Sequence, residues 1–590
     1  MTASEDDEIV FVGETRAAGG AGEGEARGVK RGRYDGTMDT LAYQALDAQD
    51  AKTNANETEA PHPPATATPN TTRDPPLFRL FRTEHISNSH NDGCVTVSDL
   101  VRGPVKWGVV SNFKIDLDFI SHAAPELLTI PRIHWLHGQP DVPEWTKENL
   151  PNKIEDKTWT FLKPQVPNYG THHSKFFLLV YPAGVRVVVS TANLCRMDLT
   201  VMSNAVWWQD FPLKSEQQVQ NHASSEFEED LLLYLNRLRW VGGEETNEDG
   251  ERVLVGPEAF RAFDYSGAGA KLIRSVPVRH NSVEETSWGH PALYRALQKQ
   301  KFPKEFEKSP VLGQFSSMGS FSEKWLNDEF RGSLCGGVIE GPDKKPLGKG
   351  QLNLIWPTKQ EVRQSLAGYV SGGSIPGSAK NVNKPHVRSK LHTWSANGSQ
   401  NSENNSDTPT DDNPCGRRQA VPHIKTFARY LEDKKNGAKL AWVFLGSHNL
   451  SGAAWGKFEH GNSQLNLLSY ELGVLLLPSL VGTRVEKPFC VVAASAQLAG
   501  EEVGPAMQCL AGARPCVAHG RSGKEVVFRH ATTVVPKDVS LSEGTSVSTV
   551  FAPLPYHVPP RRYGPHDVPW TFDETHLKPD WTGQQWHPRG

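Results

Sequence analysis

The sequence predicts an α/β protein built from two similar halves. Short β-rich runs alternate with helical stretches along most of the chain, which is the pattern of sheets flanked by helices. At 590 residues the chain is too long for one ordinary hydrophobic core, so two domains are expected. A short pattern of polar residues also occurs once in each half. These observations together predict two domains of mixed sheet and helix with a shared site between them.

The N-terminal segment differs from the rest in composition. Residues 1–75 are rich in Ala, Gly, Thr and Pro and hold 14 acidic against 7 basic side chains. Such a segment cannot bury enough apolar surface to offset the entropy of ordering, so we expect a disordered tail. Within it, residues 5–13 read EDDEIVFVG. Acidic residues before a β-forming run are typical of a segment that adds a strand to a ubiquitin-like modifier; a chance apolar cluster is the alternative.

The composition becomes globular after this tail, and we place a first domain at 76–278 and a second at 279–590. In the first domain FFLLVY and VRVVVSTANL are predicted strands, and SEFEEDLLLYLNRLRW is a predicted amphipathic helix. The second domain is interrupted by a polar, low-complexity stretch at 395–419, which we expect to be a surface insertion. Strands resume with KLAWVFLGSHNL and YELGVLLLP.

Bulk composition narrows the class of protein. The sequence has no apolar run of about 18 residues, so no membrane span is expected, and its start is acidic rather than basic and then apolar, unlike a secretory signal. Its seven cysteines are scattered without a CxxC pair, which indicates reduced thiols inside a cell. Beyond residue 75 there are 56 basic and 53 acidic residues, a balance compatible with a polyanionic partner.

The stretch THHSKFFLLV, residues 171–180, places polar groups at the start of an apolar strand. Side chains alternate between the two faces of a strand, so His173 and Lys175 share one face with Thr171. His172 takes the opposite face, where we expect it to satisfy a local hydrogen bond. A single H-x-K of this kind is more simply explained as a core histidine beside a snorkelling lysine.

The same pattern returns in PHIKTFARY, where His423 and Lys425 share a face. Both copies continue through a turn into an apolar strand, which ends in TANL at Asn193 and in SHNL at Asn449. These asparagines follow the histidines of their own copy by 20 and 26 residues. Because each copy needs the three residue types at matching offsets, the repetition favours a functional site over coincidence.

Such a set of side chains can cleave a phosphodiester without metal or cofactor. Two lysines and two asparagine amides donate hydrogen bonds to a tetrahedral phosphate oxyanion. One neutral imidazole can attack phosphorus, and the other, protonated, can give a proton to the leaving oxygen. The second imidazole can then take a proton from the water that releases the phosphohistidine. The pattern therefore predicts two half-sites that face each other, with no metal ligands.

This arrangement resembles the phospholipase D superfamily, whose full motif is H-x-K-x4-D-x6-G-S-x-N. The aspartate position holds Val180 in the first copy and Tyr430 in the second, as in the tyrosyl-DNA phosphodiesterase branch. Further stretches are similar to that branch and run in order through most of residues 76–590: YGTHHSK, GQFSSMGS, LAGYVSGGSIP, SHNLSGAAWG and SYELGVLLLP. The resemblance implies two phospholipase D-like domains, each a mixed sheet flanked by helices, with the active site between them.

The resemblance also implies a substrate and residue roles. The substrate would be DNA with a tyrosine or a topoisomerase peptide on its 3′ end. His173 would be the nucleophile and His423 the general acid and base. The groups that hold the phosphate oxygens would be Lys175, Lys425, Asn193 and Asn449.

Two further positions match family residues that orient the histidines. Glu471 in SYELGV would orient a catalytic histidine, and we expect this to be His423. Its counterpart in the first half, usually glutamine, is Asn204, whose shorter amide leaves that role open.

Residues around the site are candidates for substrate contacts. Tyr169 is expected to stack on a base, hydroxyl groups to bind backbone phosphates, and two C-terminal aromatic residues to line the peptide side. Core packing for the aromatic residues and turn formation for the hydroxyl residues are the alternatives. The candidates are Tyr169, Thr171, Ser317, Ser320, Ser451, Trp570 and Phe572, and Asn204 is counted with them as a substrate contact.

Two other functions remain open from the sequence. One is a different phosphodiesterase of the superfamily, either a nuclease or a lipid-acting enzyme; the absent motif aspartates and mildly basic core favour nucleic acid. The other is a non-catalytic nucleic-acid binder, against which the intact histidines and lysines argue. We expect a monomer without membrane association, located in the nucleus with its DNA. The cluster Lys30, Arg31 and Arg33 is too small to be a targeting signal by itself.

Overall fold

The fold is described from a computed structural model of the chain. It describes Gln44, Gly250 and residues 76–139, 158–240, 243–246, 252–281, 287–395, 416–435, 437–481, 491–499, 525–531 and 547–588. The expectations for the N-terminal tail, its segment 5–13 and most of the 395–419 insertion fall outside these residues and stay predictions. Within the described ranges, no helix has the length and apolar character needed to cross a membrane.

The first half forms a seven-stranded mixed sheet. Its strand order is β1-β7-β6-β5-β2-β3-β4. Strands β2, β3 and β4 run parallel to one another, and the other neighbouring pairs are antiparallel. The strands are β1 (Arg79–Leu80), β2 (Trp107–Asn112), β3 (Arg132–His137), β4 (Thr158–Leu162), β5 (Phe176–Tyr181), β6 (Gly184–Ser190) and β7 (Ala205–Pro212).

The second half repeats this arrangement position by position. The order is β10-β21-β18-β17-β13-β15-β16, and β13, β15 and β16 are parallel while the remaining pairs are antiparallel. Two further strands extend this sheet from β18. The strands are β10 (Lys271–Ser275), β13 (Val311–Gln314), β15 (Leu352–Ile355), β16 (Leu391–His392), β17 (Thr426–Leu431), β18 (Lys439–Gly446), β21 (Glu471–Leu476), β22 (Glu525–Ala531) and β23 (Val547–Pro553).

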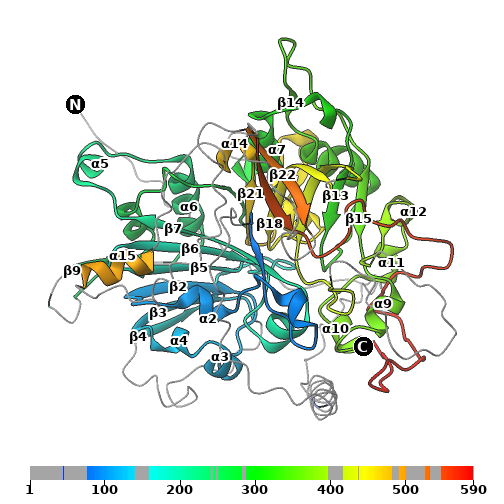
Figure 1. The fold of residues 1–590 in the computed structure, drawn as a ribbon, viewed down its shortest axis with the longest axis horizontal. Coiled ribbons are helices and arrows are strands. Elements are labelled where there is room, and N and C mark those ends of the chain that lie inside the picture. The colour runs from blue at the N-terminus through cyan, green and yellow to red at the C-terminus, as the bar shows by residue number, and fades with distance from the viewer. Residues whose placement is uncertain are drawn as a thin grey trace, which may run out of the picture.

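Helices cover both sheets, so the central strands are buried on both faces (Figure 1). Strands β5 and β6 are buried along their whole length, which explains their unbroken apolar sequence. The helices are α2 (Val97–Val101), α3 (Leu117–Ala123), α4 (Pro125–Thr129), α5 (Glu216–Gln220), α6 (Glu226–Arg237), α7 (Gly289–Gln298), α8 (Arg331–Leu334), α9 (Lys359–Arg363), α10 (Tyr369–Gly372), α11 (Ala379–Val382), α12 (Pro385–Arg388), α13 (Gly452–Trp455), α14 (Pro478–Val481) and α15 (Val491–Leu498).

One hydrophobic core runs through the junction between the two sheets. Its buried residues include Leu178 of β5, Leu235 of α6 and Val443 of β18. Helix α6 also joins the halves through charge, because Arg274 of β10 donates to the side chain of Asp230 at 2.6 Å. The two sheets are therefore packed together by continuous apolar contact, and this contact fixes the faces that meet at the site.

Two elements cross the sequence boundary expected near residue 279. Strand β10 precedes that residue but pairs with β21 in the second sheet. Helix α15 lies far beyond residue 279 in the sequence but packs on the first sheet. Figure 1 shows it beside β5 and β6. The chain thus exchanges elements between its halves, which apolar periodicity alone does not reveal.

The attachment of α15 depends on a buried ion pair. Arg186 of β6 donates to both carboxylate oxygens of Asp210 in β7, at 2.7 and 2.9 Å. The Val491 amide at the start of α15 donates to the same carboxylate at 3.1 Å. Both charged side chains are nearly inaccessible, at 6% and 1% exposure. The Asp210 carboxylate therefore links β6 and β7 to the start of α15.

We expect Asp210→Ala to destabilise the protein by about 3–5 kcal/mol, because it leaves a buried guanidinium without its partner. Denaturant unfolding followed by circular dichroism measures the loss. The matched control is Asp343→Ala, which breaks a 3.6 Å pair with Lys345 whose side chains are 72% and 71% exposed. That change should cost less than about 1 kcal/mol. Equal effects of the two substitutions would contradict the role given to Asp210.

Candidate active site

Each H-x-K segment pairs with the backbone of the other half. The Tyr470 amide donates to the Thr171 carbonyl at 2.9 Å, and the His173 amide donates to the Tyr470 carbonyl at 3.0 Å. In the opposite direction the His423 amide donates to the Ser203 carbonyl at 3.0 Å. These reciprocal bonds bring the starts of β5 and β17 together, where the two sheets meet.

Strand alternation places the polar side chains as predicted. The Nζ of Lys175 donates to the carbonyl of His173 at 2.7 Å, and Lys425 makes the same bond to His423. Both lysines are fully buried. His172 faces the other way, where its Nε2 lies 2.9 Å from the Ser111 hydroxyl. Its expected structural role is therefore confirmed.

Glu471 contacts His173, not His423 as the sequence suggested. Its Oε2 lies 3.0 Å from Nδ1 of His173 and also accepts a hydrogen bond from the Ser447 hydroxyl. The expectation was wrong because Glu471 follows Tyr470, the residue whose backbone pairs with the first H-x-K segment. The crossing of the chain between halves thus decides which histidine the carboxylate meets.

His423 is held by Asp198 and Asn204. Its Nδ1 lies 3.0 Å from Oδ2 of Asp198 and 3.2 Å from Oδ1 of Asn204. The short amide of Asn204 does reach the imidazole, and its full burial makes it a positioning residue where we had predicted a substrate contact. Asp198 was missed, since it lies in a π-helical turn, Met197–Val201, that no sequence motif marks.

The carboxylates set the proton positions on both rings. When ionised, both carboxylates only accept hydrogen bonds, so Nδ1 of His173 and Nδ1 of His423 then carry hydrogen. In the neutral ring Nε2 then holds the lone pair. Each histidine therefore offers Nε2 for chemistry while Nδ1 is anchored.

The two asparagines lie at the ends of the returning strands. The side-chain oxygen of Asn449 accepts from the Ser316 and Ser317 amides at 3.1 and 2.9 Å, which orients its NH2 as the available donor. Asn193 is buried, and its backbone N–H donates to the Asp198 carboxylate at 2.6 Å. The carboxylate that binds His423 thus also fixes the backbone at Asn193.

Burial and crowding of positive groups shift the pKa values of the site. Burial, helped by Lys175 and Lys425, lowers the pKa of His173 well below its usual value. Burial lowers the pKa of His423 to about 4 and that of Lys175 to about 8, and lowers that of Lys425 well below 10.5. An anion placed among these groups would favour their charged forms. The electrostatics of the site therefore favour an anionic ligand.

The two carboxylates respond differently. Burial raises the pKa of Glu471 to about 7, against the opposing effects of His448 and Ser447. Burial also acts to raise the pKa of Asp198, but His423 and the Asn193 amide outweigh it and lower that pKa to about 2. Asp198 is thus ionised beside His423 across the physiological range.

Four of the other predicted contact residues lie on loops that approach this site. Tyr169 is 89% exposed and adopts a left-handed backbone with φ 67°. Thr171 is half-buried, and its amide donates to the Ser469 hydroxyl. Ser317 is fixed through Asn449, and Ser451 caps α13 by accepting from the Ala454 amide. All four remain candidates for substrate contact.

The remaining predicted residues fall into two groups. Ser320 is exposed and accepts a hydrogen bond from Lys384 Nζ at 3.3 Å. Trp570 is fully buried, stacks against Tyr369 and donates to two backbone carbonyls, so its expected place on the peptide side was wrong. Phe572 is half-buried against the same core. Aromatic residues serve cores and binding surfaces alike, which is why residue type misled here.

Comparison with known proteins decides the family. The family model described as tyrosyl-DNA phosphodiesterase matches residues 77–564. The chain belongs to the tyrosyl-DNA phosphodiesterase family. Membership confirms the predicted resemblance and makes the protein a phosphodiesterase by family.

Curated tyrosyl-DNA phosphodiesterases share this sequence over most of its length. The Arabidopsis thaliana protein tyrosyl-DNA phosphodiesterase 1 is 38% identical over 513 residues, covering 87% of this chain and 76% of its own. A probable tyrosyl-DNA phosphodiesterase of Caenorhabditis elegans is 30% identical over 383 residues, covering 62% and 74%. The crystal structure of yeast tyrosyl-DNA phosphodiesterase matches with a TM-score of 0.51 at 15% identity, covering 84% of this chain and 98% of its own. The structural likeness confirms the predicted α/β fold class.

The contact between Asp198 and His423 predicts a selective defect in Asp198→Asn. Without the negative charge, protonated His423 is less stable, so with His423 as the general acid that the family resemblance implies, expulsion of a basic leaving group should slow by about 100-fold. A nitrophenyl leaving group needs little protonation and should be affected much less in the first step. Pre-steady-state release of tyrosine and nitrophenol from matched thymidine 3′-phosphodiesters measures the two effects.

The control for this comparison is Asp116→Asn, which changes a carboxylate that caps α3 through the Phe119 amide. Both substrates should react with that variant as with the unaltered protein. Equal losses on both substrates in Asp198→Asn would show a general structural defect and contradict the positioning role.

The lowered pKa of Lys175 predicts an alkaline limit to activity. With a pKa of about 8, its ammonium is charged below that pH and loses its charge as the pH rises through it. We expect this loss of charge to add a further fall in kcat/KM of about tenfold per pH unit above about pH 8, beyond the pH dependence that protonation of His423 contributes. Lys175→Arg keeps a charged donor and should move this limb to higher pH. An unchanged limb in that variant would exclude Lys175 as its source.

Proposed function

We propose that this protein hydrolyses the bond between a DNA 3′-phosphate and a tyrosine, or another group that blocks the 3′ end. The observation that carries the proposal is the pair of anchored imidazoles facing two buried lysines across the junction of the sheets. A phosphodiester has one negative charge and two non-bridging oxygens, which matches this concentration of donors. Family membership supports the choice of a tyrosyl adduct on DNA.

In the first step the Nε2 lone pair of His173 forms a bond to phosphorus. The bond between phosphorus and the tyrosine oxygen breaks, and Nε2 of His423 gives its proton to that oxygen. The hydrogen bond from Nδ1 of His173 to Glu471 stabilises the positive charge that develops on the ring. Tyrosine leaves, and DNA remains joined to His173 through a phosphorus–nitrogen bond.

In the second step His423 is neutral and acts as a base. It takes a proton from water as the water oxygen forms a bond to phosphorus, and the bond to Nε2 of His173 breaks. The products are a DNA 3′-phosphate and the original enzyme. The ionised Asp198 supports both roles of His423, because it stabilises the ring when Nε2 is protonated.

The substrate itself helps to prepare the general acid. Burial keeps His423 neutral in the free protein at pH 7, with a pKa of about 4. A phosphodiester bound between Lys175 and Lys425 brings negative charge beside the ring and raises that pKa. The lysines and asparagines supply the charge stabilisation that a metal ion provides in other phosphodiesterases, so we propose that the reaction needs none.

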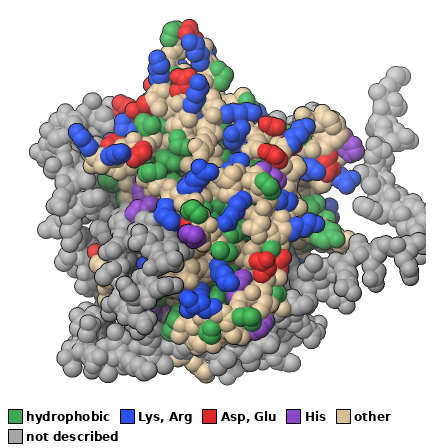
Figure 2. Space-filling model, turned by 90° about the vertical axis from the view of Figure 1, so that its right-hand side faces the viewer, with side chains coloured by type: hydrophobic (Ala, Val, Ile, Leu, Met, Phe, Trp, Pro, Cys, Tyr) green, Lys and Arg blue, Asp and Glu red, His purple; other side chains and the backbone are tan. Residues whose placement is uncertain are grey.

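A basic surface supports DNA as the rest of the substrate. Figure 2 shows Lys and Arg side chains distributed over the side of the molecule on which α11 and α12 lie in Figure 1. Lys380 of α11 is exposed, and Lys384, Arg388 and Lys390, which lie in and around α12, are half-buried. Lys384 donates to Ser320, a predicted phosphate contact. Positive groups therefore continue from the second half-site onto the surface, as a nucleic-acid backbone requires.

Two further expectations remain predictions of this proposal. The H-x-K segments of one chain complete the site, so a monomer suffices for activity, and light scattering of the purified protein tests this. A nuclear location follows from the DNA substrate, and fluorescence microscopy of the tagged full-length protein tests it.

The proposal predicts cleavage of an oligonucleotide that carries a 3′-phosphotyrosine, in excess EDTA, to give a 3′-phosphate. His173→Ala should reduce the rate by at least about 1,000-fold, because it removes the nucleophile. His423→Ala should form the intermediate from a nitrophenyl substrate and then hydrolyse it slowly. Gel electrophoresis follows the product, and mass spectrometry detects the covalent DNA–protein adduct.

The control is His460→Ala, which removes an exposed histidine and should leave the rate unchanged. Cleavage that requires added metal would contradict the two-histidine mechanism. An adduct in His173→Ala but not in His423→Ala would reverse the assigned roles. Turnover of phospholipid with none of the oligonucleotide would favour a lipid-acting enzyme, and binding without turnover would favour a nucleic-acid binder.

A further inference from the structure

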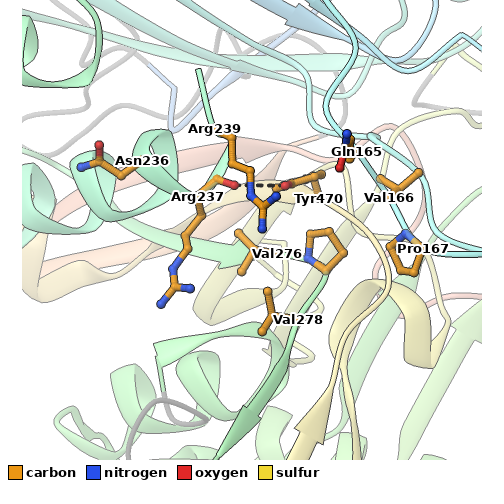
Figure 3. A pocket seen from close by; sticks show the side chains of 10 residues that line it. Gln165, Val166, Pro167, Asn236, Arg237, Arg239, Val276, Val278 and Tyr470 are labelled. Carbon is orange, nitrogen blue, oxygen red and sulfur yellow. Dashed lines mark hydrogen bonds between the residues drawn. The ribbon is translucent and has the colours of Figure 1, made fainter. Parts of the chain in front are cut away.

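A recess of about 550 Å³ opens beside the segment that carries His173 and leads into β5 (Figure 3). Four separate segments form its wall: the loop before β5, the C-terminal end of α6, the connection from β10 to β11 (Arg279–Asn281), and the residue before β21. The lining residues are Gln165, Val166, Pro167, Asn236, Arg237, Arg239, Val276, Pro277, Val278 and Tyr470. None of the catalytic residues predicted from the sequence lines it.

Tyr470 connects the recess to the nucleophile. Its hydroxyl donates to the Arg237 carbonyl at 3.0 Å, the bond drawn in Figure 3. Its backbone carbonyl accepts the His173 amide at 3.0 Å. A group bound in the recess therefore lies against the residue that holds the first H-x-K segment in place.

The loop with Tyr169 connects the recess to the substrate path. Pro167 lines the recess, and its carbonyl accepts the Gly170 amide at 2.9 Å, which closes a tight turn. Tyr169 stands on this turn with its ring in solvent. Gly170 fits closely against the second half, since a Cβ there would lie 2.0 Å from the Leu468 carbonyl oxygen. The turn is therefore fixed, with Pro167 on the recess and Tyr169 beside it.

The recess combines positive charge with an apolar wall. Arg237 and Arg239 are among its ten lining residues, and none of the ten is acidic. Burial raises the pKa of Tyr470 and the two arginines oppose that rise, so their positive charge acts at the Tyr470 hydroxyl, while Arg239 is exposed and Arg237 half-buried. Valine and proline side chains face these groups. Arginine binds phosphate, and apolar surface packs on a sugar or base, so the combination fits a nucleotide better than a free anion.

We propose that this recess is a subsite for a nucleotide of the DNA strand that carries the 3′ adduct, beyond the base that stacks on Tyr169. Arg239 and Arg237 bind the phosphate of this nucleotide, and Pro167 and Val278 contact its sugar or base. The inference rests on the proposed function and extends it. It makes the enzyme specific for adducts on a strand of several nucleotides rather than on a terminal nucleotide alone.

The test uses Arg239→Asn, because Arg239 has φ 54° and asparagine tolerates this left-handed backbone while removing the charge. Steady-state kinetics are measured on 3′-phosphotyrosyl oligonucleotides of one, two, three, four, six and eight nucleotides. For the unaltered protein, KM should fall once the strand is long enough to reach the recess. On the eight-nucleotide substrate, Arg239→Asn should have a KM about tenfold higher than the unaltered protein, with kcat unchanged.

Two comparisons separate this role from a structural defect. On the one-nucleotide substrate Arg239→Asn should match the unaltered protein. The logarithmic salt dependence of kcat/KM on the longest substrate should become shallower by about 0.7, the value of one single-strand phosphate contact. The matched control is Arg102→Gln, which removes a partly exposed arginine that pairs with Asp99 and lies outside the recess. It should show the full length dependence.

The outcomes distinguish this inference from the proposed function. If the unaltered protein cleaves none of the substrates, the proposed function fails. If it cleaves them with a KM that Arg239→Asn leaves unchanged at every length, the recess assignment fails alone. The recess assignment would also be overturned if the fall in KM required a complementary strand, or followed the length of an acidic peptide on the adduct.

Discussion

The burial of two lysine ammonium groups in one site is the constraint on which the rest of the arrangement depends. Lys175 and Lys425 are both inaccessible to solvent, and the positive charge of Lys175 adds to burial in lowering the pKa of Lys425. Removing such groups from water is costly unless opposite charge compensates it. Glu471 and Asp198 provide compensation, but each is also engaged with a histidine. In the proposed function, a bound phosphate would offset the positive charge that these two carboxylates leave uncompensated.

The duplicated sheet explains how two equivalent half-sites come to face each other. Both halves have the same strand order and directions, so each H-x-K segment begins the same strand of its sheet. Reciprocal backbone bonds then join each segment to the start of a strand in the opposite half: the first segment bonds to Tyr470 before β21, and the second to Ser203 before β7. As a result, the carboxyl or amide group at the start of that strand reaches the histidine of the other half. The positioning of each histidine depends on correct packing of both sheets.

Much of this could be predicted from the sequence, and the errors have physical causes. Strand alternation separated His173 from His172, because side-chain direction along a strand depends only on local geometry. The partner of Glu471 could not be predicted this way, since it depends on the crossing of two segments 298 residues apart. Asp198 lies in an irregular turn without a motif. Trp570 shows that an aromatic residue expected at a binding surface can belong wholly to the core.

The central claim is that phosphate transfer occurs in two steps through a histidine of the protein. The stereochemical course at phosphorus tests this most directly. A 3′-phosphotyrosyl oligonucleotide with a chiral phosphorothioate linkage is hydrolysed in water enriched in oxygen-18, and the configuration of the thiophosphate product is determined. Two in-line displacements, first by His173 and then by water, predict net retention. Net inversion would mean a single direct attack by water and would contradict the account.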